Sequence, residues 1–94
     1  MKEPFPIETG RIVVSRAGCD KGTAYVVLGM PSADRAIVAD GKRRTADHPK
    51  TKNCRHLAAR PELVPGIREK VESKKRIFDQ ELRNSLDAAG YTDT

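Results

Sequence analysis

Apolar residues in the first two thirds of the chain form short runs that are separated by polar turns. The runs are rich in valine and isoleucine and cover residues 12–14, 25–28 and 36–39. Runs of this kind, bounded by glycine, proline or aspartate, are typical of β-strands. The segments between them predict turns over residues 18–23, 29–34 and 40–41. A less regular strand is expected over about residues 53–58.

Short strands in this number are too few for a sandwich of ordinary size, but they can curl into a barrel filled by a handful of aliphatic side chains. We therefore predict a mostly β fold with an α-helical part, in which residues 10–60 form a small barrel of about four or five strands. Asp40-Gly41 is a strong tight-turn dipeptide, because both residues tolerate positive φ. Residues 1–9, which include Pro4 and Pro6, are predicted to be a flexible, extended arm.

Beyond residue 60 the apolar spacing changes to that of a helix. Five apolar residues recur at intervals of four or seven: Ile67, Val71, Phe78, Leu82 and Leu86. This spacing places them on one helix face, so residues 61–94 are predicted to form a C-terminal helical extension that stops at Gly90. Polar residues at 73–79 interrupt the face, so one long helix or two short helices would both fit, and Asp79 could cap the second. We expect this face to pack on the barrel; the alternative is a docking face for another protein or another copy of the chain.

The chain is basic, and its surplus charge lies in one part of the sequence. Eighteen Lys and Arg against thirteen Asp and Glu give the 94 residues a net charge of +5. Residues 42–60 hold seven basic residues and a single acidic one, Asp47. A run of one sign favours a polyanion such as nucleic acid as the partner, although a basic run can also be a solvated face.

The sequence also indicates where the protein works. Its first residues contain no apolar run typical of a secretory signal, and no run of about eighteen apolar residues could span a membrane. We therefore expect a soluble, cytoplasmic protein without a membrane partner. In a reducing cytosol Cys19 and Cys54 are expected to be free thiols.

Residues 10–22 read as a strand followed by a turn with glycine and lysine, and residues 23–29 read as a second strand that ends on glycine. This is the KOW pattern, and over about residues 10–59 the chain resembles the small bacterial KOW-domain RNA-binding proteins. Residues 35–44, with the run Val-Ala-Asp-Gly-Lys, and the basic residues 50–57 extend the resemblance. These proteins are in turn similar to KOW-containing large-subunit ribosomal proteins of archaea and eukaryotes. The resemblance implies an SH3-like barrel that binds RNA, above all ribosomal RNA, without catalysis.

The predicted RNA contacts combine this resemblance with the charge pattern. They are Arg16, Lys21, Gly22, Lys42, Arg43, Arg44, Lys50, Lys52, Arg55 and His56. Arginine can hold a phosphate with two hydrogen bonds, whereas lysine acts as a point charge. Gly22 follows Lys21 at a loop tip, where the missing Cβ lets the backbone approach a phosphate. The alternative is that Gly18 and Gly22 only shape a hairpin.

Aromatic residues are scarce, and the sequence assigns Tyr25 and Phe78 to the core. A surface that reads unpaired bases normally offers stacked aromatic rings. We therefore expect recognition of folded RNA through its shape and phosphate positions, with little reading of sequence.

Metal and enzyme sites find little support. His48, Cys54 and His56, with Cys19, are zinc-ligand types, but their spacing matches no usual zinc finger, so no metal and no cofactor are expected. No serine or cysteine has a recognisable catalytic base nearby, and Asp20 and Asp40 are interpreted as turn formers that bond their own backbone. We expect a protein that is not an enzyme.

Two other functions remain open. One is an SH3-like protein-interaction adapter associated with the transcription or translation machinery, whose groove should expose apolar or aromatic residues. The other is binding of double-stranded DNA, which shares the phosphate chemistry. The helical extension could also contact a ribosomal protein, and the oligomeric state is left open.

Overall fold

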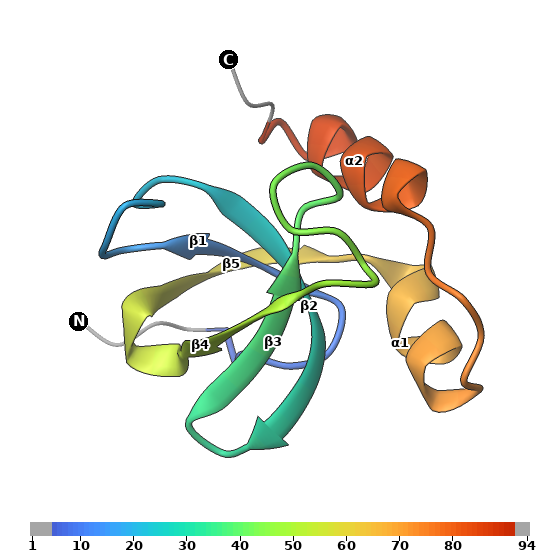
Figure 1. Ribbon diagram of the computed structural model, residues 1–94, viewed down its shortest axis with the longest axis horizontal. Coiled ribbons are helices and arrows are strands. Elements are labelled where there is room, and N and C mark those ends of the chain that lie inside the picture. Colours follow the sequence, from blue (N-terminus) through green and yellow to red (C-terminus); the bar gives the residue numbers. More distant parts are fainter. Residues whose placement is uncertain (1–4, 92–94) are drawn as a thin grey trace.

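The structure, a computed structural model, describes residues 5–91 of the chain. Its strands are β1 (Arg11–Ser15), β2 (Ala24–Ser32), β3 (Arg35–Ala39), β4 (Lys50–Asn53) and β5 (Leu57–Leu63). A short 3-10 helix, η1 (Cys54–His56), links β4 to β5, and the helices α1 (Pro65–Glu72) and α2 (Asp79–Ala88) follow. The prediction of a mostly β fold followed by helices is confirmed (Figure 1).

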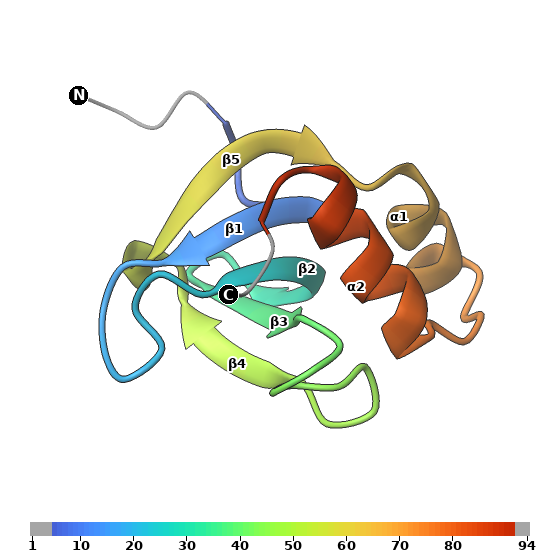
Figure 2. The same ribbon diagram turned by 90° about the horizontal axis from the view of Figure 1, so that it is seen from above.

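The five strands form one antiparallel sheet in the order β4-β3-β2-β1-β5. The last strand returns to the first: β1 pairs with β2 on one side, Val13 facing Tyr25, and with β5 on the other, Val13 facing Ala59. Among residues 5–91, β4 and β5 do not pair with each other, so the sheet is curved but not closed. Figure 2 shows β4 and β5 at opposite sides of the sheet and both helices at one end.

Two apolar clusters explain why the strand sequences are continuously apolar. Successive side chains of a strand point to opposite faces. Ile12 and Val26 therefore belong to one cluster, while their neighbours Val13 and Val27 belong to the other. Both faces of the central strands are covered, which removes the alternation of apolar and polar residues that a half-exposed sheet shows.

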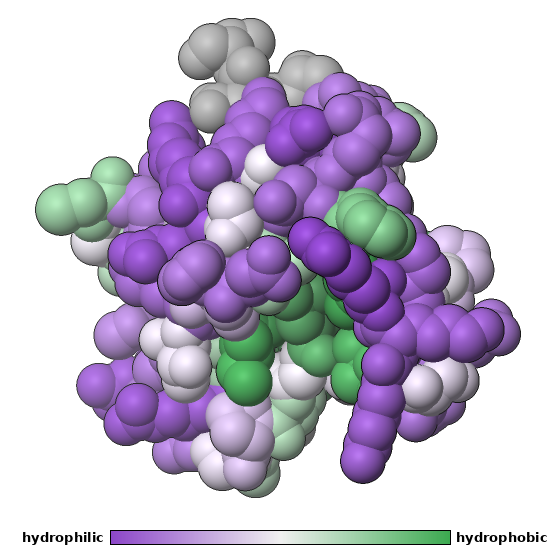
Figure 3. All heavy atoms as spheres, turned by 45° about the vertical axis from the view of Figure 1, so that its right-hand side comes forward, coloured by the Kyte–Doolittle hydropathy of each residue, from purple (hydrophilic) through white to green (hydrophobic). Residues whose placement is uncertain are grey.

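The helical region is two short helices, and it packs on the sheet as expected. Ile67 of α1 and Leu82 and Leu86 of α2 are buried in the first cluster. Val71 and Ile77 pack against it but keep some exposed surface, and Figure 3 shows an apolar area in the middle of the face on the side of the helices.

The assignment of Phe78 to the core is wrong, whereas that of Tyr25 is confirmed. Phe78 is 54% exposed, and Tyr25 is 2% exposed. The chain leaves the helical path between α1 and α2, so the apolar stripe is not continuous and Ile77 packs against the first cluster in place of Phe78.

The N-terminus of α2 is not capped by Asp79 as predicted, whereas its C-terminus ends at Gly90 as predicted. Glu81 Oε1 accepts a hydrogen bond of 2.8 Å from the backbone N–H of Phe78. Asp79 instead accepts one of 2.7 Å from the backbone N–H of Ala46, so it ties α2 to the loop before β4. At the other end Gly90 takes a φ of 88° and Tyr91 N donates to Leu86 O, which is the predicted glycine stop.

Three predicted boundaries are wrong. The strand predicted over 53–58 is η1 followed by β5, because Asn53 Oδ1 accepts a hydrogen bond from Arg55 N and turns the chain into η1. The division at residue 60 falls inside β5, an edge strand that tolerates Pro61 and pairs with β1 as far as Leu63. The turn predicted over 29–34 is mostly strand, since β2 continues to Ser32.

The predicted N-terminal arm lies only partly within the described residues, because 1–4 fall outside them. In the remaining part, Pro6 O accepts a hydrogen bond of 2.9 Å from Arg11 Nε, and Ile7 packs against the second cluster. Residues 5–9 are therefore attached to the sheet rather than free of it.

Candidate nucleic-acid interface

A cleft of about 820 Å³ opens between the β1–β2 loop, the loop after β3 and helix α2. Its basic lining residues are Lys21, Lys42, Arg43, Arg44, Lys50 and Arg83. The carboxylates in the same lining are Asp20, Asp40 and Asp87, so the basic groups outnumber the acidic ones by two to one. The cleft is therefore open to solvent and carries a surplus of positive charge.

Asp40 shapes the loop that carries three of these basic residues. Its Oδ1 atom accepts hydrogen bonds of 2.9 Å from Lys42 N and 3.0 Å from Arg44 N. This is the turn role predicted for Asp40. Asp40 therefore fixes the backbone of the loop from which the exposed side chains of Lys42, Arg43 and Arg44 extend.

Helix α2 holds the same loop from its other side. Arg83 Nη1 donates a hydrogen bond of 2.7 Å to Gly41 O. Gly41 has a φ of 79°, and a Cβ atom there would lie 2.5 Å from Asp79 O, at the start of α2. Glycine is thus required at this position both by the left-handed backbone and by the close approach of the helix.

The β1–β2 loop forms the opposite wall. Gly22 has a φ of 91°, and a Cβ atom there would meet no atom within 4 Å, so the space beside its backbone is open. Lys21 is exposed next to it. Arg43 Nη1 donates a hydrogen bond of 3.1 Å to Thr23 Oγ1, which links this wall to the loop after β3.

Asp20 has a larger role than the turn former that we predicted. Its Oδ1 accepts a hydrogen bond of 2.9 Å from Ser15 Oγ, and its Oδ2 accepts one of 2.7 Å from Tyr25 Oη. Lys52 Nζ lies 2.9 Å from both carboxylate oxygens. Asp20 thereby fixes the β1–β2 loop to β1, β2 and β4, and we call these four residues the Asp20 clamp.

Burial and hydrogen bonding shift the pKa values of Asp20 and Tyr25 in the Asp20 clamp. Burial disfavours the ionised Asp20, but hydrogen bonds from Lys52, Tyr25 and Ser15 outweigh it and hold the pKa of Asp20 well below its usual range. Burial and the hydrogen bond to Asp20 raise the pKa of Tyr25 well above its usual value. At neutral pH the carboxylate is charged and the phenol is neutral.

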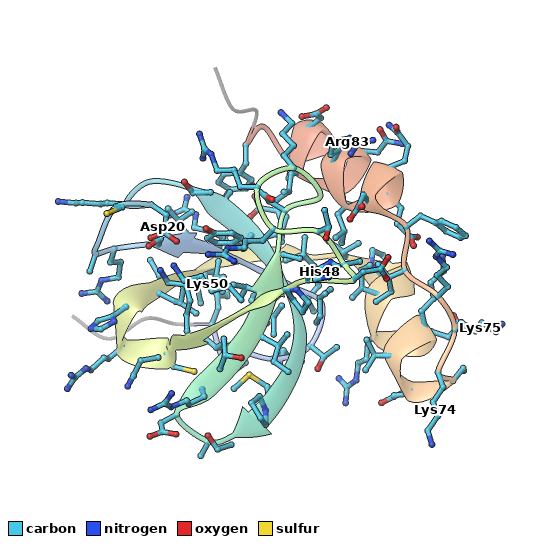
Figure 4. All side chains as sticks on the ribbon, in the orientation of Figure 1. Asp20, His48, Lys50, Lys74, Lys75 and Arg83 are labelled. Atoms are coloured by element: carbon cyan, nitrogen blue, oxygen red, sulfur yellow. The ribbon has the colours of Figure 1, made fainter. Side chains whose placement is uncertain are left out.

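The Asp20 clamp corrects the prediction that Lys52 contacts RNA. The Lys52 side chain is 8% exposed, and its ammonium group is paired with Asp20, so it does not belong to the exposed basic surface. Lys50, at 38% side-chain exposure, lies 3.7 Å from Asp20 Oδ2 and also lines the cleft. Figure 4 shows Asp20 and Lys50 close together, with Arg83 extending from α2.

The remaining predicted contacts lie elsewhere. Arg16 N donates a hydrogen bond of 2.7 Å to His56 O, which places Arg16 beside η1. Neither of these residues, nor the exposed Arg55, lines the cleft. Of the ten predicted residues, the structure thus brings six to the cleft: Lys21, Gly22, Lys42, Arg43, Arg44 and Lys50.

Sequence reasoning missed the contribution of α2. Arg83 and Tyr91 line the cleft although both lie in the nearly neutral C-terminal part of the chain. The one available signal is that Arg83 is the only basic residue of α2. Tyr91 Oη donates a hydrogen bond of 2.9 Å to Glu62 Oε1 and accepts one from Arg60 Nε, so the segment that follows α2 is attached to β5.

Other chemistry is limited in the described part of the chain. Cys19 and Cys54 are free thiols, and burial together with Asp34 raises the pKa of Cys54. Among residues 5–91 no three His, Cys, Asp or Glu side chains gather in a group that could hold a metal ion. None of the helices in that range is both long and apolar enough to cross a bilayer.

No protein-family model matches the chain.

Proposed function

We propose that this protein binds RNA without catalysis and holds RNA phosphates in the cleft between the β1–β2 loop, the loop after β3 and α2. The observation that carries the proposal is the convergence of six basic side chains from distant parts of the sequence on one cleft. Phosphate contacts of this kind supply most of the affinity of nucleic-acid binding proteins.

We further propose that the open sheet is an SH3-like barrel of the KOW type. The pairing of β5 with β1, the last and the first strand along the chain, supports this interpretation. The glycine-rich β1–β2 loop, to which the KOW resemblance assigns RNA contacts, forms a wall of the cleft. Structured RNA of the large ribosomal subunit, in the cytoplasm, is the proposed partner.

The composition of the cleft favours RNA over a protein partner. An adapter groove should expose apolar side chains, whereas the exposed residues of this cleft include Lys21, Lys42, Arg43 and Arg44. Leu86 also lines the cleft but is buried. Such a surface attracts a polyanion and offers little to an apolar peptide.

The double variant Lys42→Ala/Arg44→Ala is expected to bind RNA at least about tenfold more weakly than the wild type at moderate salt. Loss of two phosphate contacts should also reduce the slope of log affinity against log salt by about 1.5. Fluorescence anisotropy with a labelled RNA hairpin measures both quantities. The matched control is Arg35→Ala/Arg68→Ala, which removes the same charge from exposed positions outside the cleft.

Equal losses in the two double variants would mean that only net charge matters, and the cleft would then not be the binding site. An RNA affinity unchanged in both would exclude the cleft as the binding site, and a wild-type protein that bound no RNA would refute the proposed function itself. Sedimentation of lysates tests the proposed partner: the protein should travel with large subunits at low salt and be released at high salt. A protein that stays at the top of the gradient at low salt would exclude the ribosomal partner.

A further inference from the structure

Phe78 is an exposed aromatic ring surrounded by basic side chains. It is 54% exposed and belongs to neither core cluster. Arg76 Cζ lies 5.1 Å and Lys70 Nζ 5.7 Å from the centre of its ring. A single exposed apolar residue needs no explanation, but a ring that already attracts two cations can also bind other flat, polarisable groups.

Glu81 holds the backbone of Phe78 and the ammonium group of Lys70 beside the ring. The carboxylate of Glu81 accepts the backbone N–H of Phe78 through Oε1, and Lys70 Nζ donates to both of its oxygens at 2.8 and 2.7 Å. One side chain therefore fixes both the residue that carries the ring and the ammonium group beside it. A residue whose backbone is already fixed loses less freedom when a ligand packs on its side chain, which favours binding.

Further basic residues precede Phe78 in the linker between α1 and α2. Lys74, Lys75 and Arg76 are all exposed. Lys74 takes a φ of 57°, a left-handed conformation that is uncommon for a residue other than glycine and turns the chain sharply at this point. Figure 4 shows the side chains of Lys74 and Lys75 pointing away from the body of the protein.

Two residues close to Phe78 contact the loop after β3, which carries basic residues of the cleft. Asp79, the neighbour of Phe78, accepts a hydrogen bond from Ala46 N, and Arg76 Nη2 lies 3.9 Å from Asp47 Oδ2. Ala46 and Asp47 follow Lys42, Arg43 and Arg44 in the same loop, after Thr45. A strand of RNA that leaves the cleft over this loop would meet Phe78 and the linker.

We propose that Phe78 stacks on an unpaired base of the bound RNA, while Lys74, Lys75 and Arg76 attract the phosphates on either side of that base. This inference rests on the proposed function and adds a second kind of contact, to single-stranded RNA beside the structured part. Every nucleobase has a flat face, so stacking selects unpaired over paired nucleotides rather than one base over another.

Phe78→Ala is expected to weaken binding of a hairpin with a large unpaired loop about tenfold, in the range for loss of one stacked base. Binding of a blunt duplex of similar length should stay within about twofold, because its bases are not free to stack. Both affinities are measured by fluorescence anisotropy, and thermal unfolding confirms that the variant is folded. Leu63→Ala is the matched control, since Leu63 is also a large apolar residue, is 49% exposed and does not line the cleft.

Phe78→Trp gives a direct readout of stacking. The sequence contains no tryptophan, so this variant would carry a single one at the proposed contact. We expect it to bind the loop-containing hairpin as tightly as the wild type does, and its fluorescence to be quenched by that hairpin but not by the duplex.

The outcomes separate this inference from the proposed function. If Phe78→Ala binds the hairpin like the wild type while Lys42→Ala/Arg44→Ala does not, the stacking inference is wrong and the cleft remains. If neither variant weakens binding, both the stacking inference and the cleft are wrong as contacts, and a wild type that binds no RNA at all refutes the proposed function. Equal losses with hairpin and duplex, or with Leu63→Ala, also overturn the inference. So does a blue shift of the tryptophan emission with phosphatidylserine vesicles without quenching by RNA, which would indicate a lipid surface as the ligand.

Discussion

Replacing Asp20 by alanine is expected to lower the free energy of unfolding by about 3 kcal/mol, because the ammonium group of Lys52 would stay buried without its counterion. The side chains of Asp20 and Lys52 are 14% and 8% exposed, so little solvent would screen the remaining charge. Ser15 and Tyr25 would also lose their acceptor. The expected loss is a large part of the about 5–15 kcal/mol that stabilises a typical domain. Urea unfolding at neutral pH measures it.

Two further variants show whether the loss comes from the charge. Asp47→Ala is the control, since Asp47 is 70% exposed and its contact with Arg76 is 3.9 Å long; its loss should change stability by less than about 0.5 kcal/mol. Asp20→Asn/Lys52→Met removes both charges and should regain much of the stability lost in Asp20→Ala. If Asp20→Ala were no less stable than Asp47→Ala, the Asp20 clamp would not stabilise the fold.

The pH dependence of stability has a defined sign. Because the folded state lowers the pKa of Asp20, its stabilising effect is fully present above the unfolded pKa of about 4 and is lost as the pH falls below that value. The difference in stability between the wild type and Asp20→Ala should therefore shrink between neutral pH and pH of about 3. A difference that grew on acidification would contradict the Asp20 clamp.

Gly41→Ala is expected to destabilise the protein by about 3 kcal/mol or more and to weaken RNA binding. The added Cβ would lie 2.5 Å from the backbone oxygen of Asp79, so either α2 or the loop after β3 must move. The left-handed backbone adds about 1–2 kcal/mol of strain. Movement of the loop would also break the hydrogen bond from Arg83 to Gly41 O and displace basic residues of the cleft. Thermal unfolding and RNA anisotropy test the two effects.

Gly22→Ala separates the clash at Gly41 from backbone strain. Gly22 has a similar φ of 91°, but its Cβ atom would stand in open space. Backbone strain alone should therefore lower the free energy of unfolding of Gly22→Ala, by about 1–2 kcal/mol, and α2 should stay in place. Equal destabilisation by the two variants would mean that the contact between Gly41 and α2 has no energetic importance.

Sequence patterns predicted the fold well where the pattern reflects burial. The strands at 12–14, 25–28 and 36–39 lie inside β1, β2 and β3, and the apolar stripe at Ile67, Leu82 and Leu86 packs on the sheet. These segments bury apolar side chains on both faces of the sheet or on one face of a helix, and burial is what periodicity reports. The strand after Asn53 was misplaced because a side-chain hydrogen bond there turns the chain, and no periodicity records such a bond.

The candidate site was harder to predict because charge along a sequence does not reveal which charges are paired. Lys52 belongs to the most basic segment of the chain, yet Asp20, which lies 32 residues away, buries and neutralises it. Arg83 belongs to a nearly neutral segment, yet it faces the same cleft as Lys42. Phe78 fits the spacing of a buried stripe, and only the break between the two helices leaves it exposed.

The contact of Arg83 with Gly41, 42 residues apart, has a consequence for the order in which the protein matures during synthesis. Chains leave the ribosome from the N-terminus at about 5–20 residues per second, so the strands emerge before α2 does. Until α2 has emerged and docked, one wall of the cleft is missing and the loop after β3 lacks its support. A nascent chain would therefore expose the basic residues of the loop after β3 before the cleft is complete.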